Sequence, residues 1–168
     1  MIAAASSGKG GSRGGLGQQL ADIGDGLAEA CEELRQVSHG IHPAVLSQGG
    51  LRPALGALRR RAAIPVELSV NVNRRLAESV EVAAYYVVAE ALTNTAKHGQ
   101  ASTAYVSASI DEGHLHVSVS DNGVGGAVLG GGSGLIGLKD RVESVSGKLT
   151  MSSPLGQGTT LTVRIPVN

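Results

Sequence analysis

Polar side chains recur at four-residue intervals in the segment 90–98, which reads EALTNTAKH. Glu90, Asn94 and His98 would share one face of a helix, because residues four apart are neighbours on the helix surface. A carboxylate and an amide oxygen one turn apart can hold a hard cation, directly or through water. Lys97 and His98 are placed to reach phosphate oxygens. The solvated face of an ordinary amphipathic helix would show the same stripe, so both interpretations stay open on this motif alone.

A second polar group, DNGVGG at 121–126, directly follows an apolar segment. Asp121 at the end of a strand can accept a hydrogen bond from an exocyclic amine. Gly123 and Gly125 permit positive φ and a close approach of a flat ring to the backbone. Asp-Asn-Gly also favours turns strongly, so a plain turn is the alternative interpretation.

Two glycine-rich segments follow. The run GGGSGLIG at 130–137 leads into a helical pattern, where exposed N–H groups form a ready anion site, although a linker has the same composition. Residues 132–137 match GxGxxG, but a glycine loop precedes them and no acidic residue lies about 20 positions on, which excludes a dinucleotide fold. No P-loop motif is present either. The turn GQGTTL at 156–161 leads into the last apolar segment, as a plain hairpin would.

Hydrophobic periodicity predicts the elements that position these groups. Helical patterns cover 17–39, 49–63, 78–97 and 135–146, and strand patterns cover 66–72, 103–110, 115–120, 148–152 and 159–165. Gly99 is the expected cap of the third helix, and the turns 111–113 and 154–158 predict hairpins. The order predicts an α+β fold: a two-layer α/β sandwich with a mixed, mostly antiparallel sheet, preceded by an N-terminal helix.

The composition limits the function classes. The 168 residues are 42% hydrophobic, with 14 basic and 14 acidic residues, and that balance argues against nucleic acid as the main partner. Cys31 is the single cysteine, so no intrachain disulfide forms and a reducing compartment fits. There is no run of 18 apolar residues, so we expect a cytoplasmic segment without membrane contact, although the parent protein could be membrane-anchored.

Together, in this order and spacing, the four motifs resemble the N, G1, G2 and G3 boxes of the GHKL (Bergerat-fold) ATPase superfamily. That superfamily includes gyrase and Hsp90 ATPase domains, sensor histidine kinases and MutL. The resemblance covers roughly residues 49–167. The stretches GIHPAVL at 40–46 and GLRPAL at 50–55 look like the segment between the dimerization and catalytic domains of NarX/DesK-type sensor histidine kinases. The short lid and the absence of a Phe-containing F box fit that subfamily.

The resemblance implies an ATP site with Mg²⁺. Asn94 and Glu90 would be the metal-binding residues, and Glu90 would also be catalytic, orienting water on the ion or assisting proton transfer. Asp121 would hold the adenine amine, with Gly125 beneath the ring. The residues that the resemblance assigns to nucleotide, from the phosphate contacts through the adenine site to the lid, are Asn94, Lys97, His98, Asp121, Gly123, Gly125, Gly134, Leu135, Gly137, Leu138 and Thr159.

One departure concerns the phosphoacceptor. The family's acceptor histidine is followed by an acidic residue, whereas His39 precedes Gly40 and His42 precedes Pro43. We therefore expect a fragment with a disordered tail at 1–16, a partial dimerization helix and linker at 17–48, and the ATP-binding domain at 49–168.

The expected function is that of the catalytic part of a protein histidine kinase. This chain would bind ATP without autophosphorylating. The full-length protein would be a homodimer that phosphorylates its own histidine and passes the phosphate to a response regulator. Two alternatives remain: a GHKL serine kinase of the anti-sigma-factor type, and a nucleotide-binding module without turnover. The His42-Pro43 stretch favours the sensor kinase over the first, and the intact Glu90, Asn94 and Asp121 count against the second.

Overall fold

The computed structural model describes residues 44–128 and 133–167. The predictions for 1–43 and for Gly130–Gly132 lie outside the described residues. In chain order the elements are α2 (Ala44–Gly49), α3 (Leu51–Arg61), β1 (Val66–Asn71), α4 (Glu78–Asn94), the π-helix η1 (Thr95–Gly99), β2 (Ala104–Asp111), β3 (His114–Asp121), α5 (Ser133–Ser144), β4 (Lys148–Ser152) and β5 (Thr160–Pro166).

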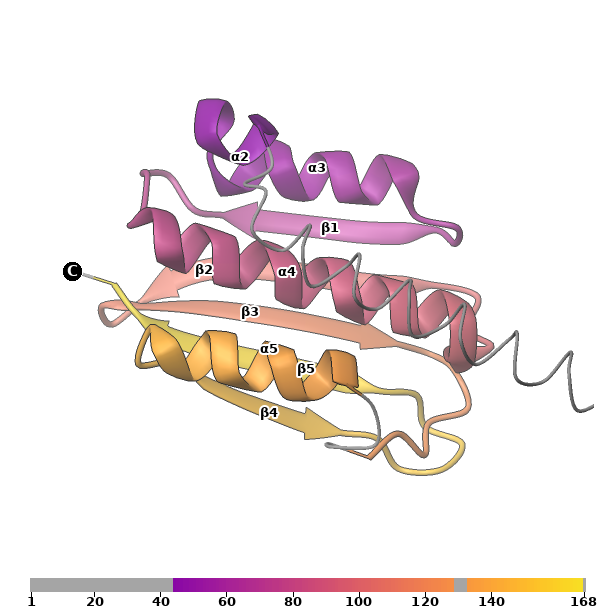
Figure 1. Ribbon diagram of the computed structural model, residues 1–168. Coiled ribbons are helices and arrows are strands. Elements are labelled where there is room, and N and C mark those ends of the chain that lie inside the picture. The colour runs from indigo at the N-terminus through magenta and orange to yellow at the C-terminus, as the bar shows by residue number, and fades with distance from the viewer. Residues whose placement is uncertain (1–43, 129–132, 168) are drawn as a thin grey trace, which may run out of the picture. The chain divides into compact units, whose positions relative to one another are not determined.

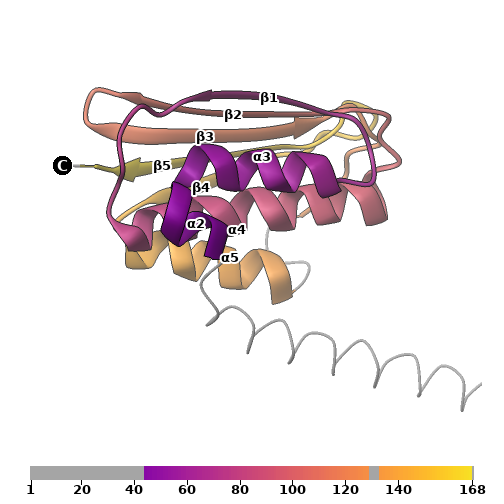
Figure 2. The same ribbon diagram turned by 90° about the horizontal axis from the view of Figure 1, so that it is seen from above.

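The five strands form one sheet in the order β1-β2-β3-β5-β4. β1 and β2 are parallel because α4 carries the chain back between them, and the other three pairings are antiparallel. Seen edge-on in Figure 2, the sheet has α3, α4 and α5 on one side. The predicted two-layer sandwich with a mixed, mostly antiparallel sheet is therefore confirmed.

The core lies between the sheet and α4, the central helix of its layer (Figure 1). Alternate residues of β3 and β5 face the helices and pair in register, as in Leu115 with Ile165 and Val117 with Val163. The other face is polar, and hydroxyl residues such as Ser118 and Thr162 are paired there. One buried and one polar face is the arrangement typical of an antiparallel sheet covered on one side.

The predicted helix 49–63 is present as α3, which begins two residues later at Leu51 and ends at Arg61, and a further short helix, α2, precedes it. Gly50 has φ of 75° and separates α2 from α3, because a left-handed residue cannot continue a right-handed helix. The sequence pattern did not indicate α2, whose six residues contain one buried side chain, Leu46. None of the helices in the described ranges is long and apolar enough to span a bilayer.

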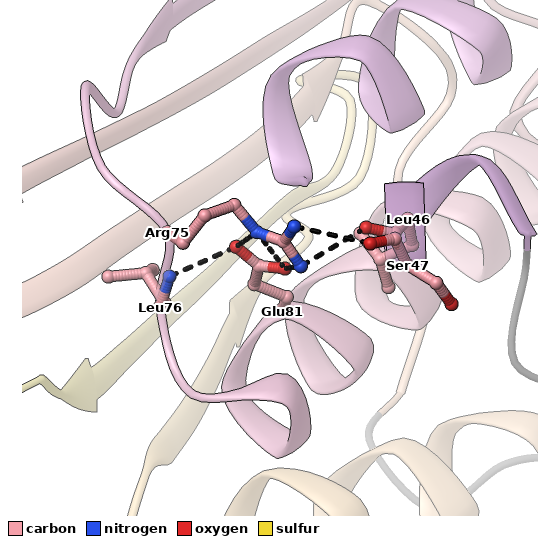
Figure 3. Close-up of polar contacts among 5 residues, drawn as sticks. All are labelled: Leu46, Ser47, Arg75, Leu76 and Glu81. Carbon is pink, nitrogen blue, oxygen red and sulfur yellow. Dashed lines mark hydrogen bonds and ion pairs between the residues drawn. The ribbon is translucent and has the colours of Figure 1, made fainter. Parts of the chain in front are cut away.

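An ion pair between the half-exposed Arg75, in the loop before α4, and the buried Glu81 of α4 also reaches the end of α2 (Figure 3). Arg75 Nη2 donates to Glu81 Oε2 at 2.9 Å and Arg75 Nε to Glu81 Oε1 at 3.1 Å. The same guanidinium donates to the carbonyl oxygens of Ser47 (3.2 Å) and Leu46 (3.4 Å), and the Leu76 amide donates to Glu81 Oε1 at 3.0 Å. Glu81 is 1% exposed, and the hydrogen bond to it raises the pKa of Arg75 above its ordinary value. The Ser47 carbonyl near the end of α2 thereby gains a donor, and the Leu46 carbonyl, which already accepts the Gly50 amide at 2.8 Å, gains a second one.

Candidate functional site

A pocket of about 380 Å³ opens between α4, the end of β3 and the start of α5. It gathers residues from five segments of the chain, which belong to α4 and η1, the end of β3 with the loop after it, α5, β4 and the start of β5. The lining residues are Glu90, Ala91, Asn94, Thr95, His98, Gly99, Val119, Asp121, Gly125, Gly126, Ala127, Val128, Gly134, Leu135, Met151, Thr159 and Leu161. The sequence-predicted residues among them are Glu90, Asn94, His98, Asp121, Gly125, Gly134, Leu135 and Thr159.

Asp121 lines this pocket because it is the last residue of β3 on the face that is turned toward the helices. Its Oδ1 accepts hydrogen bonds from the amides of Gly123 (2.9 Å) and Thr159 (3.2 Å). Its Oδ2 lies 3.0 Å from the hydroxyl of Thr95. Donors from three segments therefore fix the carboxylate in one orientation.

The glycines around Asp121 allow backbone to pack on backbone. A Cβ on Gly123 would overlap the carbonyl of Gly99, and a Cβ on Gly125 would overlap that of Pro154. Gly158, with φ of 73°, lies in the same way against the carbonyl of Asp121 itself. Gly125 lines the pocket, whereas the structure places Gly123 against the backbone of η1 and outside the lining.

The polar stripe Glu90, Asn94 and His98 lines the wall opposite the sheet. The predicted helix 78–97 ends as an α-helix at Asn94 and continues as the wider π-helix η1, a conformation often found at functional sites. Gln100, with φ of 48°, takes the left-handed capping conformation that we predicted for Gly99. Lys97 is exposed and lies outside the lining.

Within residues 44–128 and 133–167, the side chains of Glu90 and Asn94 make no hydrogen bond or ion pair. Both are half-buried and face the cavity. Their oxygens are therefore available to a ligand.

The start of α5 forms the remaining wall. α5 begins at Ser133, earlier than the predicted Leu135, so Gly134 is helical and lies against the Glu90 carboxylate. Gly137 is exposed, with nothing within 4 Å of an added Cβ, and Leu138 is 5% exposed within the core. The structure thus places these last two residues outside the pocket lining.

Sequence reasoning missed two features of the site. The first is its apolar floor, where Leu161 pairs with Val119 on one side and Met151 on the other. The alternation of apolar residues along the strand that ends at Asp121 could have indicated this floor. The second is Thr95, whose contact with Asp121 spans 26 positions and leaves no sequence signal.

Comparisons with known proteins identify the family of the chain. Residues 79–168 match the family described as "Histidine kinase-, DNA gyrase B-, and HSP90-like ATPase". The chain is 29% identical to the oxygen sensor histidine kinase NreB of Staphylococcus carnosus, over 84% of this chain and 43% of that protein. It is 34% identical to the sensor histidine kinase NarS of Mycobacterium tuberculosis, over 84% of this chain and 35% of that protein.

A similar fold occurs in the histidine kinase domain of a blue-light-activated kinase from Erythrobacter litoralis. The TM-score is 0.56 at 21% identity, covering 69% of this chain and 58% of that one. The chain belongs to the histidine kinase-, DNA gyrase B- and HSP90-like ATPase family. The GHKL resemblance is therefore confirmed, and the curated relatives above are sensor histidine kinases. The chain spans less than half the length of either.

Proposed function

We propose that this chain binds Mg–ATP in the pocket and acts as the catalytic domain of a sensor histidine kinase. The observation that carries the proposal is that one part of the cavity is apolar beside a carboxylate, whereas the opposite wall carries polar oxygens. Asp121 stands beside the apolar floor of Val119, Met151 and Leu161, which suits a flat ring with an exocyclic amine. Glu90 and Asn94 supply unpaired oxygens on the opposite wall, which suits phosphate-bound metal.

Magnesium fits this donor set as a companion of the nucleotide. The described residues contain no cluster of three or more His, Cys, Asp or Glu side chains able to hold a metal ion. Mg²⁺ commonly uses one or two protein oxygens together with substrate phosphates and water. Asn94 and Glu90 would hold the ion, which would neutralise phosphate charge. His98 and Lys97 would contact the phosphates, although Lys97 would have to turn inward.

Phosphoryl transfer demands mainly positioning and charge neutralisation from the protein. Asp121 would fix the base, with Gly125 beneath it and Thr159 alongside. Glu90 would orient water on the metal or assist proton movement at the phosphate end. The residues Gly134, Leu135, Gly137 and Leu138 would close over the phosphates, which requires α5 to shift for the last two to approach. The phosphate would pass to a histidine on a dimerization domain.

The partners follow from the same proposal. The relatives named above are sensor histidine kinases, which favours the sensor over the anti-sigma-type serine kinase. The full-length protein would act as a homodimer on a response regulator, with this domain in the cytoplasm. The proposed division of the chain into a tail (1–16), a dimerization helix with linker (17–48) and this domain (49–168) belongs to the same account.

The test is phosphorylation of the full-length gene product by γ-labelled ATP. We expect acid-labile, base-stable label, as for phosphohistidine, and its loss in an Asn94→Ala variant. Acid-stable label on serine would instead support the serine kinase. Nucleotide binding with no label on any residue would support a module without turnover.

A further inference from the structure

The hydroxyl of Thr95 lies between two acceptors in the wall of the pocket. Its Oγ1 is 3.0 Å from Asp121 Oδ2 and 2.9 Å from the carbonyl oxygen of Ala91. Thr95 is 5% exposed, so water does not replace either contact freely. A hydroxyl carries a single proton, which it can donate fully to one of these acceptors.

The hydroxyl proton of Thr95 is donated to Asp121 Oδ2 and not to the Ala91 carbonyl. The Ala91 carbonyl already accepts the backbone N–H of Thr95, so it is satisfied without the hydroxyl. Oδ2 belongs to a carboxylate that also accepts two backbone amides through Oδ1, and hydrogen bonds to a carboxylate are about twice as strong as those to a neutral carbonyl. Donation to Ala91 would also turn a hydroxyl lone pair toward the negative Oδ2.

The remaining contacts of Asp121 show which atom faces a ligand. Oδ1 accepts from the amides of Gly123 and Thr159, and these fill its two lone-pair directions. Among residues 44–128 and 133–167, Thr95 is the only donor to Oδ2, which leaves this oxygen one lone-pair direction. The hydroxyl of Thr95 therefore sets where that last lone pair points.

Building on the proposed adenine site, we infer that Thr95 is a positioning residue that makes the pocket select a 6-amino purine over a 6-oxo purine. Because the Thr95 proton is engaged, the Thr95–Asp121 pair offers the base an acceptor and no donor. An exocyclic amine donates into the free lone pair of Oδ2. A carbonyl oxygen in the same place meets a negative charge without a bridging proton. Removing the hydroxyl would release Oδ2 from the direction that Thr95 sets, so an amine in the same place would no longer meet an aligned lone pair.

The experiment compares ATP with ITP, whose hypoxanthine carries a carbonyl where adenine carries the amine. Affinities for both, with Mg²⁺, are measured by calorimetry on the chain and on Thr95→Val, which keeps the shape and removes the hydroxyl. We expect the ATP:ITP affinity ratio to fall about tenfold, the loss of one hydrogen bond to a charged group. Thr95→Ser keeps the hydroxyl and should retain the ratio within about threefold.

The outcomes separate this inference from the proposed function. If the unmodified chain does not bind Mg–ATP, the proposed function itself fails. If it prefers ATP and Thr95→Val keeps the same ratio, or loses affinity equally for both nucleotides, Thr95 has a structural role only and the inference is wrong. Thr95→Ala serves as a second variant if valine perturbs the fold. Failure of both to fold, judged by thermal melting, would also overturn the inference, because Thr95 would then be needed for folding.

Discussion

Gly134 lies against the carboxylate of Glu90 so closely that a Cβ on residue 134 would overlap Glu90 Oε1. Gly134 is not among the glycines with positive φ, so its backbone conformation is open to any residue. A larger side chain would have to displace the end of a flexible side chain and no backbone. A substitution at Gly134 therefore tests function separately from stability. Displacing the end of the Glu90 side chain should cost the fold little, but it should disturb the proposed metal site.

Gly134→Ala should leave the free energy of unfolding unchanged or raised by up to about 1 kcal/mol, since alanine is the better helix former. It should nevertheless reduce the Mg²⁺-dependent part of ATP affinity by about tenfold through displacement of Glu90. Calorimetry with and without Mg²⁺ measures this difference. Gly56→Ala in α3 is the matched control, because Gly56 is also helical, lies outside the pocket lining, and an added Cβ there meets only the end of the Arg60 side chain at 3.6 Å. Identical nucleotide binding by the two variants would contradict the assignment.

Gly158 and Gly156 form a second matched pair, both with φ of 73°. A Cβ on Gly158 would overlap the backbone carbonyl of Asp121, whereas nothing lies within 4 Å of one on Gly156. Gly156→Ala should cost about 1 kcal/mol from backbone strain alone. Gly158→Ala should cost about 1–3 kcal/mol more and weaken ATP binding by moving Asp121. Chemical denaturation and nucleotide titration of both variants provide the test, and equal losses would mean that the close approach is unimportant.

The ion pair between Arg75 and Glu81 should stabilise the attachment of α2. Glu81→Gln removes the charge from a fully buried position and weakens the bonds to Arg75, at a cost of about 1–3 kcal/mol. Proteolysis within α2 should become faster, because Arg75 also holds the carbonyls of Leu46 and Ser47. Glu143→Gln in the exposed pair with Lys139 is the control and should change stability by less than about 1 kcal/mol. A Glu81 variant as stable as this control would show that the pair contributes nothing.

Alkaline pH should destabilise the protein through Tyr86. Burial raises the pKa of Tyr86 above its ordinary value of 10.0, although Arg141, 4.6 Å above the ring, opposes the rise. The unfolded state then ionises first, so this stability is present below pH 10 and is lost as the pH rises through the raised pKa. The free energy of unfolding, measured by denaturation at a series of pH values, should change in parallel for Tyr86→Phe and the unmodified protein below pH 10. Above pH 10 the variant should lose less stability. If the free energy of unfolding changes in parallel over the whole pH range, the pKa of Tyr86 is not raised.

Much of the fold could be predicted because its signals are local. Alternation in segments such as 115–120 and 148–152 placed strands correctly, and the turn residues near Gly113 predicted a hairpin that the register confirms. The break at Gly50 was missed, because the side chains that leave no room for a Cβ there, Arg75 and Glu81, lie about 25 to 30 residues away in the sequence and give no local signal.

The candidate site was predictable only where one segment carried the pattern. Glu90, Asn94 and His98 line the pocket together because helical spacing is a local property. The contact between Thr95 and Asp121 depends on how η1 packs against the end of β3, and the apolar floor depends on strand order. Gly123 illustrates the same limit, since its sequence context indicates close approach but not whether a ring or the Gly99 carbonyl approaches it.

Titration of the chain with Mg–ATP in a calorimeter tests the central claim most directly. We predict one site per chain with a dissociation constant between micromolar and sub-millimolar, about −5 to −8 kcal/mol. Asp121→Ala should abolish the preference for adenine nucleotides, and Asn94→Ala should remove the Mg²⁺ dependence while some adenosine affinity remains. The absence of both heat and thermal stabilisation at millimolar Mg–ATP would contradict the account.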